Sequence, residues 1–489
     1  MWLGGGVWTA FMKLIFALLC PVILALSLAR ADIAIGHYDM ASVRDVSTLE
    51  PRVLEDWRPL AKDAALRSKL VEITVCEWWS GQKVRLPVAM LAPADKVCTN
   101  VLIENMALAP KVPVPTGAKL RLLKEHGVGL IYIGMVPITD MEPVGQLHLQ
   151  MEEHFIKTKE ARYTPAWIWG LSDMRALTAA MAEKEVFQPK KVLTTGGSKR
   201  GVATAASCIA DDRITAMMPV VAPIIDSPGG PYVEGTLDPA ITKMNEEFLA
   251  NMPSEVGRNA MIVRQKARSD ERLTLESVKA AGWSEAEIKA ASSLAWEVCR
   301  TTNYLDALAK RGVEIFYCEG SNDNVGPGLI ELGKRFPQLP IYVMPGGQHG
   351  GAKEAGFTKS VASQADVDDN LYAFATHHFF GTRRGIQSPQ MTVQRDKQTQ
   401  HFSLSVTFPD GAEPQSNEVF WSVNRHPDYS MQMEFDEWKS APMEKQAEAT
   451  YKAEITIEGD VKTVDFISVH KHTEAGTTFT ISSAELRVR

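Results

Sequence analysis

The chain has 489 residues, more than one ordinary domain contains, so we expect two globular units. Its composition, 45% hydrophobic and 23% charged, is typical of a packed soluble protein. The formal net charge is only −7, from 52 basic and 59 acidic side chains, and no long basic run occurs. Nucleic-acid binding therefore has no electrostatic support and is excluded.

The first 31 residues predict a signal peptide. Lys13 precedes an apolar run over residues 14–28, and Ala29-Arg30-Ala31 is the small-x-small pattern that signal peptidases accept. We expect cleavage after Ala31 and a secreted or periplasmic protein. The alternative is an uncleaved anchor, although the run is short for a membrane span of about 20 residues. The first eleven residues are apolar and Gly-rich, so the true start is either Met1 or Met12.

Five cysteines remain in the expected mature chain: Cys76, Cys98, Cys208, Cys299 and Cys318. An exported protein can form disulfides. Cys76 and Cys98 fall in strands that we predict to be neighbours, so they are the best candidate pair, and the odd count leaves at least one free thiol. The alternative is that all five are small buried apolar residues. No C-x-x-C or H-x-x-x-H spacing indicates a metal, and we expect no cofactor.

From Lys69 onward, predicted strands and helices alternate. Residues 70–76 and 84–91 predict an antiparallel hairpin. Helical spacing occurs at residues 117–126 and 167–185. Apolar strands, as in a buried parallel sheet, are predicted at residues 101–104, 128–136, 191–195, 214–221, 313–318 and 341–344. This alternation predicts an α/β protein with a mostly parallel, doubly wound sheet.

One stretch interrupts the alternation. Residues 229–302 are charged, rich in Met and Glu, and helical in pattern, and Ser284 with Glu287 predicts a capping box at one helix start. An insertion of this size between two strands is either a lid over a site or a structural addition. We expect it to lie within a catalytic domain over residues 32–386.

After residue 387 the pattern changes to short strands of alternating polarity, separated by turns such as Pro409-Asp410-Gly411. About 100 residues of this kind predict a β-sandwich over residues 387–489. Such a domain either binds carbohydrate or only packs on its neighbour. Trp421 and Trp438 are expected in its core rather than on a sugar-binding surface.

A strand, a glycine-flanked serine and an Ala-rich helix follow one another around residues 191–201, which is the order of a nucleophile elbow. The sharp turn strains the serine backbone, so the flanking residues must be small. Gly196, two residues before Ser198, meets this demand. Arg200 stands where the G-x-S-x-G pattern has its second glycine, and Gly201 follows one position later. The match is imperfect, and Ser198 is a candidate nucleophile.

Two further residues complete a candidate triad. Asp323 follows the strand at residues 313–318, and the acid of an α/β hydrolase lies at such a strand end. His349 follows the next strand, at residues 341–344. The chain order Ser, Asp, His is the one this fold requires, unlike that of chymotrypsin-type enzymes. An Asx-turn aspartate and a loop histidine are the structural alternatives, but three such coincidences in the right order favour a triad.

The predicted mechanism follows from the chemistry of these three side chains. His349 takes the proton of Ser198, because a free hydroxyl is a weak nucleophile near neutral pH, and Asp323 holds the imidazole tautomer. The backbone N–H of Lys199, at the helix N-terminus, would donate to the oxyanion. We expect the second donor from the loop after the third strand, near residues 105–107, with Met106 as the candidate.

Lys199 and Arg200 are cations in the first turn of a helix, where each opposes the macrodipole by roughly 0.3–1 kcal/mol when exposed. They either form a structural ion pair with a nearby carboxylate, which we favour, or recognise an anionic group on the substrate. Arg200 is the candidate substrate-binding residue.

The turn Gly196-Gly197-Ser198-Lys199-Arg200-Gly201 resembles the G-A-S-K-R-G turn of the PhoPQ-activated pathogenicity-related protein family. Residues 153–169 are similar to the family's acidic, aromatic helix, and residues 320–323 to its G-T-x-D turn. Phe420-Trp421-Ser422-Val423-Asn424, with the step at Asp428, resembles its C-terminal Trp-containing strand. Asn324-Val325 and Tyr429-Ser430 depart from the family pattern. The resemblance implies an α/β-hydrolase-like fold with a triad at Ser198, Asp323 and His349, and no settled substrate.

Our first hypothesis is an exported serine hydrolase that cleaves an ester or amide of a small-molecule or peptide substrate through an acyl-enzyme. A thioester is less expected outside the cytosol, and a peptidase related to prolyl or aminoacyl hydrolases is a subclass of this hypothesis. The second hypothesis is a secreted binding or signalling protein on a hydrolase scaffold, with little or no activity. The intact triad residues favour the first. Substrate and oligomeric state stay open.

Overall fold

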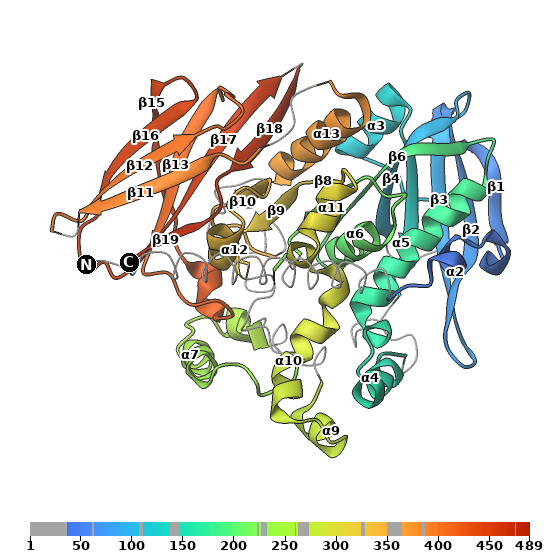
Figure 1. Ribbon diagram of the computed structural model, residues 1–489, viewed down its shortest axis with the longest axis horizontal. Helices are drawn as coiled ribbons and strands as arrows, with labels where there is room; N and C mark the ends of the chain where they lie inside the picture. The colour runs from blue at the N-terminus through green and yellow to red at the C-terminus, as the bar shows by residue number, and fades with distance from the viewer. Residues whose placement is uncertain are drawn as a thin grey trace, which may run out of the picture.

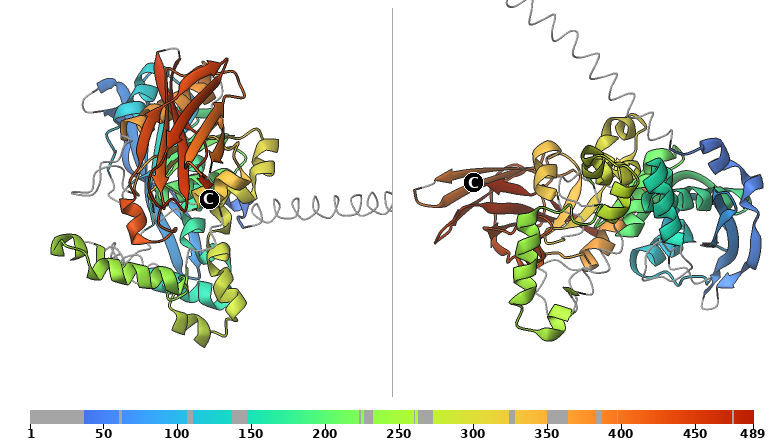
Figure 2. Two further views of the ribbon diagram at one scale, coloured as in Figure 1. Left: turned by 90° about the vertical axis from the view of Figure 1, so that its left-hand side faces the viewer. Right: turned by 90° about the horizontal axis from the view of Figure 1, so that it is seen from below.

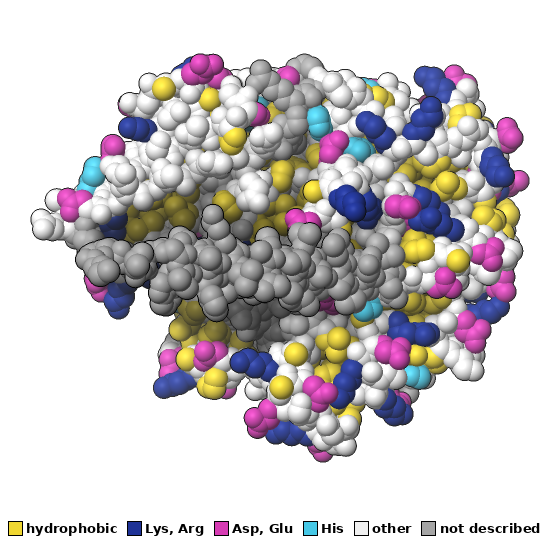
Figure 3. All heavy atoms as spheres, in the orientation of Figure 1, with side chains coloured by type: hydrophobic (Ala, Val, Ile, Leu, Met, Phe, Trp, Pro, Cys, Tyr) yellow, Lys and Arg dark blue, Asp and Glu magenta, His cyan; other side chains and the backbone are white. Residues whose placement is uncertain are grey.

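The computed structural model describes residues 37–60, 63–106, 111–136, 147–222, 224–225, 232–259, 261–262, 273–323, 328–349, 364–382, 387–396, 398–474 and 476–489 (Figure 1). The predicted signal peptide lies outside the described residues. In the part of the chain that is described, no helix has both the length and the apolar character needed to cross a membrane. Acidic and basic side chains are intermixed on the face seen in Figure 3, in line with the small net charge.

A mixed sheet organises the first part of the chain. Its described strands lie in the order β1-β2-β3-β5-β4-β6-β7-β9-β10, with β8 paired to β7. The pairings from β5 through β4, β6, β7 and β9 to β10 are parallel, whereas β1, β2, β3 and β5 pair antiparallel. The bounds are β1 Arg52–Leu60, β2 Asp63–Trp79, β3 Gln82–Pro93, β4 Cys98–Met106, β5 Gly129–Gly134, β6 Phe187–Gly197, β7 Ala216–Val220, β8 Glu314–Ile315, β9 Tyr317–Gly320 and β10 Ile341–Met344.

Helices cover both faces of this sheet, as predicted. Helices α5 (Pro165–Ala182) and α6 (Lys199–Ala210) pack into one apolar cluster with the strands, and α3 (Gly117–His126) and α13 (Gln364–Phe380) pack into the other. The central strands are apolar on both sides because both sides are covered. The remaining helices of this part are α2 Met40–Arg44, η1 Val46–Leu49, η2 Ala161–Tyr163, α11 Leu305–Lys310 and α12 Leu329–Arg335.

The proposed pairing of Cys76 with Cys98 is wrong, because all five described cysteines are free thiols. Strands β2 and β3 form the predicted hairpin, but β4, where Cys98 lies, is separated from β2 by β3 and β5. Neighbouring strands are about 4.8 Å apart, so the two cysteines lie on strands about 14 Å apart. A disulfide requires Cα atoms within about 7 Å. Burial raises the pKa of Cys76 to about 12 and that of Cys98 to about 11, which suppresses the reactive thiolate.

The predicted helical insertion follows β7. It contains α7 Pro239–Ala250, α9 Leu275–Ala280, α10 Glu285–Ala295, η3 Glu297–Cys299 and η4 Thr301–Asn303, and α4 (Leu147–Thr158) packs against it. The capping box of Ser284 and Glu287 is confirmed at the start of α10. A small aromatic cluster around Phe155 and Trp283 forms the insertion's own core. Figure 1 shows α7, α9 and α10 below the central sheet, and Figure 2 shows α7 standing out from the body.

Two antiparallel sheets form the last part of the chain. One has the order β11-β12-β16-β15 and the other β14-β13-β17-β18, with β19 paired to β17. Phe402 of β12 and Phe466 of β17 meet between them, with ring centroids 5.4 Å apart. The bounds are β11 Gln390–Asp396, β12 His401–Thr407, β13 Ser416–Val423, η5 Met431–Phe435, β14 Lys439–Pro442, β15 Glu444–Ala447, β16 Thr450–Thr456, β17 Val464–Glu474, β18 Thr477–Ser482 and β19 Leu486–Val488.

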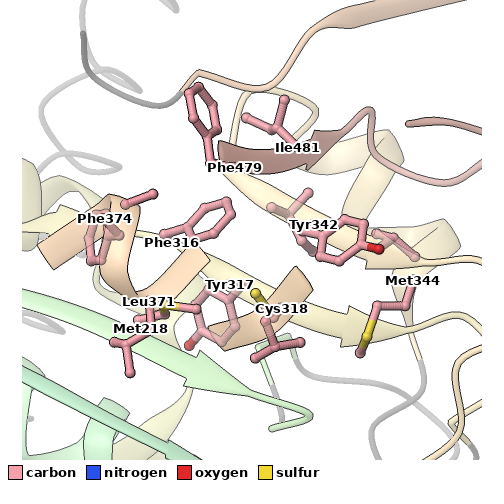
Figure 4. Packing of buried hydrophobic residues seen from close by; sticks show 14 of the residues in the cluster. Met218, Phe316, Tyr317, Cys318, Tyr342, Met344, Leu371, Phe374, Phe479 and Ile481 are labelled. Atoms are coloured by element: carbon pink, nitrogen blue, oxygen red, sulfur yellow. The ribbon is translucent and has the colours of Figure 1, made fainter. Parts of the chain in front are cut away.

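The C-terminal sheets pack directly on the edge of the larger sheet. The Ser388 and Ser482 hydroxyls accept hydrogen bonds from the outward N–H groups of Ile341 (3.1 Å) and Val343 (2.8 Å) in the edge strand β10. Asn370 of α13 exchanges two hydrogen bonds with the backbone of Thr480 in β18. Figure 4 shows the apolar counterpart, in which side chains of β18 approach those of β9, β10 and α13. The predicted boundary after residue 386 falls between α13 and β11.

Candidate active site

Ser198 stands in a strained turn between β6 and α6. Its backbone has φ 56° and ψ −123°, a combination that L-residues with a side chain rarely adopt. Two backbone hydrogen bonds hold it there: the Ser198 N–H donates to the Val220 carbonyl (2.9 Å), and the Ser198 carbonyl accepts from the Val202 N–H (3.0 Å). The strain is thus supported by the neighbouring strand β7 and by the first turn of α6, which fixes where the hydroxyl points.

The two glycines of the turn allow the strand and helix to approach. A methyl group added to Gly196 would lie 2.5 Å from Arg200 Cβ and 3.0 Å from its carbonyl carbon. One added to Gly201 would lie 2.7 Å from Ala222 Cβ. Position 201 therefore faces the end of β7, where a side chain would have to displace Ala222.

The next two strand ends carry the other candidate residues. Asp323 ends the acid turn, residues 320–323, after β9, and His349 ends the histidine turn, residues 345–349, after β10. The turns interlock, because the Asn322 N–H donates to the Gly347 carbonyl (2.8 Å) and a methyl group added to Gly320 would lie 2.4 Å from that carbonyl oxygen. Parallel pairing of β9 with β10 thus brings both turns to the same edge of the sheet.

The three predicted triad residues lie within hydrogen-bonding distance. Ser198 Oγ is 2.7 Å from His349 Nε2, and His349 Nδ1 is 2.9 Å from Asp323 Oδ2. A carboxylate can only accept, so the Nδ1–H of His349 donates to it and leaves Nε2 to accept the serine proton. The Asp323 side chain is fully buried, whereas the His349 side chain is 20% exposed and reaches the surface of the site.

The predicted oxyanion donors lie at the start of α6 and at the end of β4. Lys199 is the first residue of α6, and helix N-terminal N–H groups favour negative charge. Met106 is the last residue of β4, the strand beside β6. Under that strand end, buried Asn105 donates to Asp173 of α5, and burial raises the pKa of Asp173 to about 8. Residue 107, also considered as a donor, lies outside the described residues.

Arg200, the candidate substrate-binding residue, is exposed in the first turn of α6. Among the described residues, no ion pair or hydrogen bond of its guanidinium occurs, so the structural ion pair favoured from the sequence is not observed there. Lys199 is half-buried and has contacts of its own. Arg200 follows Ser198 by two residues in the chain.

Sequence reasoning missed Glu319, which lies directly before the acid turn. Its side chain is 1% exposed, and Oε1 accepts the backbone N–H of Ala222 at 2.9 Å, so it ties the end of β7 to β9. Burial, with the nearby Asp323 carboxylate, raises the pKa of Glu319 well above its usual range. A glutamate next to the apolar run 313–318 was the available signal, but only the fold reveals its partner.

We expect Glu319→Gln to change how stability depends on pH. The raised pKa means that the folded chain keeps a proton that the unfolded chain releases above about pH 4.3. The free energy of unfolding of the wild type should therefore decrease as the pH rises from about 4.3 towards the raised pKa of Glu319 in the folded chain. The variant carries no titrating group at this position and should not show this decrease. Urea unfolding at about pH 5 and about pH 8 measures the difference, which should favour Glu319→Gln more at the higher pH.

Glu319→Ala serves as the companion variant. It leaves the Ala222 N–H without its acceptor, which costs about 1–3 kcal/mol in addition to the cavity. Equal pH dependence of the wild type and Glu319→Gln would show that Glu319 keeps no extra proton in the folded state.

Trp438 was expected in the core of the C-terminal sandwich, together with Trp421. Both are partly buried against the main apolar cluster. The indole N–H of Trp438, however, donates to Asn322 Oδ1 at 2.9 Å, in the acid turn. Nothing in the sequence pairs these two positions, which are far apart in the chain.

A known protein family matches the region around the elbow. The sequence model of the PhoPQ-activated pathogenicity-related protein family matches residues 153–229. No curated protein sequence matches the chain. Among solved structures, acetyl xylan esterase 1 from Thermoanaerobacterium sp. JW/SL YS485 is similar, with 12% identity and a TM-score of 0.35 over 65% of this chain and 86% of that one. Glucuronoyl esterase from Solibacter usitatus has 14% identity and a TM-score of 0.37 over 68% of this chain and 86% of that one. Candida antarctica lipase A in its closed state has 11% identity and a TM-score of 0.37 over 72% of this chain and 86% of that one.

These TM-scores are low, and the fold is identified from the strand order of the chain and the positions of its turns. The parallel strands have an elbow after β6, and the next two strand ends along the sheet beyond β7 carry an acid turn and a histidine turn, which is the α/β-hydrolase arrangement. The family match contains α5, β6, the elbow and α6. The chain is thus similar to the PhoPQ-activated pathogenicity-related protein family over residues 153–229, and it has the predicted α/β-hydrolase fold.

Proposed function

We propose that this chain is a serine hydrolase that cleaves an ester or amide bond through an acyl-enzyme. The observation that carries the proposal is the continuous hydrogen-bond chain from Ser198 Oγ through His349 to Asp323, with distances of 2.7 and 2.9 Å. Two of its members sit on interlocked turns and the third on a strained elbow. Such strain persists only where the surrounding structure supports it, and it is common at active sites.

Each residue has a role in the proposed reaction. His349 Nε2 removes the proton as Ser198 Oγ attacks the carbonyl carbon, and the resulting imidazolium later gives that proton to the leaving alcohol or amine. Asp323 stabilises the imidazolium and holds its tautomer. The backbone N–H of Lys199, with a second donor at or beside Met106, stabilises the oxyanion. Water then attacks the acyl carbon as His349 accepts its proton, and the imidazolium returns that proton to Ser198 Oγ as the acid product leaves.

Arg200 is proposed to receive a negatively charged group of the substrate, because its guanidinium is exposed beside the elbow. A comparison of Arg200→Gln with the wild type on an anionic and a neutral ester measures this role. A KM that rises only for the anionic ester supports it, and equal changes for both esters contradict it.

Export of the chain is proposed from residues 1–31. N-terminal sequencing of the mature protein should find Asp32 first, and an intact N-terminal segment would contradict cleavage. Burial also suits the thiols to an oxidising compartment, because it raises the pKa of Cys208 and of Cys299 to about 12 and keeps both protonated.

A fluorophosphonate probe tests the proposed activity. The purified wild type should react covalently at Ser198, and Ser198→Ala should lose the label while keeping its melting temperature. Ser207→Ala is a matched control, since Ser207 is buried on the same helix α6 and contacts Asp173 rather than the triad. A folded wild type that takes no label would contradict the hydrolase and favour the binding or signalling protein.

A further inference from the structure

We propose that the β13–β14 connection, residues 424–438, positions the triad by holding the acid turn and the histidine turn together. Trp438 is the central positioning residue. The connection belongs to the C-terminal sheets, so these sheets would take part in building the active site rather than only packing beside it. The inference rests on the proposed function, because positioning has a catalytic consequence only if the three residues react.

Hydrogen bonds tie the connection to the acid turn next to Asp323. Asn322 is 1% exposed, its Nδ2 donates to the Asp436 carbonyl (2.8 Å), and its Oδ1 accepts from Trp438 Nε1 (2.9 Å). Both polar atoms of this side chain are therefore used by the connection. In addition, the Arg425 guanidinium donates to the Ser321 carbonyl. These contacts restrict the backbone that orients the Asp323 carboxylate.

The same connection holds the histidine turn next to His349. Gln348 is 8% exposed, and its Nε2 donates to the Glu434 carbonyl at 2.8 Å. Trp438 also lies beside this turn, since a methyl group added to Gly346 would lie 3.7 Å from Trp438 Cδ1. One side chain thus bonds to the acid turn and lies beside the histidine turn, which restricts how far the imidazole can move from its carboxylate partner.

The connection is itself anchored firmly in the C-terminal sheets. The Arg425 side chain is 2% exposed, and its guanidinium lies 5.7 Å from the centre of the Trp438 ring. It pairs with the buried carboxylates of Glu485 and Asp465. A buried charge cluster of this kind allows few alternative arrangements, because separating one member leaves a charge unpaired. Trp438 is therefore presented to the turns from a rigid base.

The other side of the connection contacts the helical insertion. Asn245 of α7 accepts the Met431 N–H (2.7 Å) and donates to the Tyr429 carbonyl (3.3 Å), and the rings of Phe248 and Phe435 lie 5.3 Å apart. In Figure 1 the β13–β14 connection lies between the C-terminal sheets and α7. The two triad turns and the insertion thus share one support.

Trp438→Phe tests the inference, because it removes the indole N–H while keeping an aromatic ring. With p-nitrophenyl acetate as the probe, we expect kcat to fall about 10- to 100-fold with KM within about twofold, since small displacements of reacting groups have effects of this size. The low-field proton resonance of the His349–Asp323 hydrogen bond, identified by its absence in His349→Ala, should weaken or shift.

Gln348→Met is the second variant, for the case that Trp438→Phe does not fold. It removes the donor to Glu434 with little change of volume and should also lower kcat and alter the resonance. Trp421→Phe is the matched control: Trp421 lies in β13 of the same sheet and packs on the apolar cluster, so its replacement should leave both readouts unchanged.

The outcomes separate the two proposals. A folded Trp438→Phe or Gln348→Met with wild-type kcat and an unchanged resonance would overturn the positioning role while leaving the hydrolase intact. A wild type that neither hydrolyses the probe ester nor reacts with a fluorophosphonate would overturn the hydrolase itself. If Trp438→Phe and the control Trp421→Phe both lost kcat and stability to a similar extent, the effect would be one of general packing. That result would also overturn the positioning role.

Discussion

Replacing Asp323 with asparagine should lower kcat for an activated ester by about 10³- to 10⁴-fold, with little change in melting temperature. The His349 Nδ1–H now donates to a carboxylate at 2.9 Å. The amide of asparagine can present a donor to Nδ1 instead, which favours the tautomer with its proton on Nε2. That tautomer cannot accept the proton of Ser198, and the same substitution in another serine-triad enzyme costs about 10⁴-fold.

Asp212→Asn is the matched control for this experiment. Asp212 carries an exposed carboxylate beside Arg44, at the far end of α6 from the elbow. Removing one exposed charge there should change kcat by less than about twofold and stability by less than about 1 kcal/mol. If Asp323→Asn kept most of the wild-type kcat, His349 would not depend on this carboxylate and the proposed triad would be wrong.

The two adjacent glycines before Ser198 should respond very differently to alanine. In Gly196→Ala the added methyl group would lie 2.5 Å from Arg200 Cβ, so β6 or α6 must move. We expect a loss of about 1–3 kcal/mol in the free energy of unfolding from overpacking. Displacement of the elbow should also reduce fluorophosphonate labelling by about 10²-fold, because nucleophile and base are no longer aligned.

Gly197→Ala provides the internal control. The added methyl group would meet its nearest atom, the Val220 carbonyl oxygen, only at 3.9 Å. Stability should stay equal or increase by up to about 1 kcal/mol, because alanine restricts the unfolded chain. Thermal unfolding and labelling rates of both variants measure the contrast. Similar behaviour of the two alanine variants would show that the elbow does not depend on close contact between Gly196 and α6.

Much of the central sheet could be predicted from local pattern. Helix α3 and strand β10 have the predicted bounds, and each central apolar run overlaps the sheet, although the run at residues 313–318 is divided between β8 and β9. Such runs are informative because a parallel strand buried on both faces tolerates few polar residues. By contrast, β1 was not predicted: many of its residues are exposed, so it shows no apolar run.

The candidate triad could be placed from chain order, since strand ends of a parallel sheet meet at one edge. The disulfide prediction was wrong because order along the chain does not give order across the sheet. Strand β5 inserts between β3 and β4, and this separates Cys76 from Cys98. Crossover connections of this kind are fixed by how helices pack on the two faces, which no local pattern in the sequence records.

The contacts of Glu319 and Trp438 could not be predicted either. Glu319 accepts the backbone N–H of Ala222, just after β7, and Trp438 donates to Asn322, more than one hundred residues away. Composition indicates only that a tryptophan is a good core residue. Its partner depends on how the C-terminal sheets are rotated on the central sheet, and that rotation comes from packing throughout the apolar cluster.

The hydroxyls of Ser388 and Ser482 determine how far this chain could be shortened. They occupy the outward amides of β10, which would otherwise be an open sheet edge. A fragment ending after α13 would expose that row of amides to other molecules, and open edges recruit strands from neighbouring chains. By covering this edge, the C-terminal sheets prevent β10 from pairing with strands of other molecules. A shortened chain that does not aggregate would therefore have to keep them.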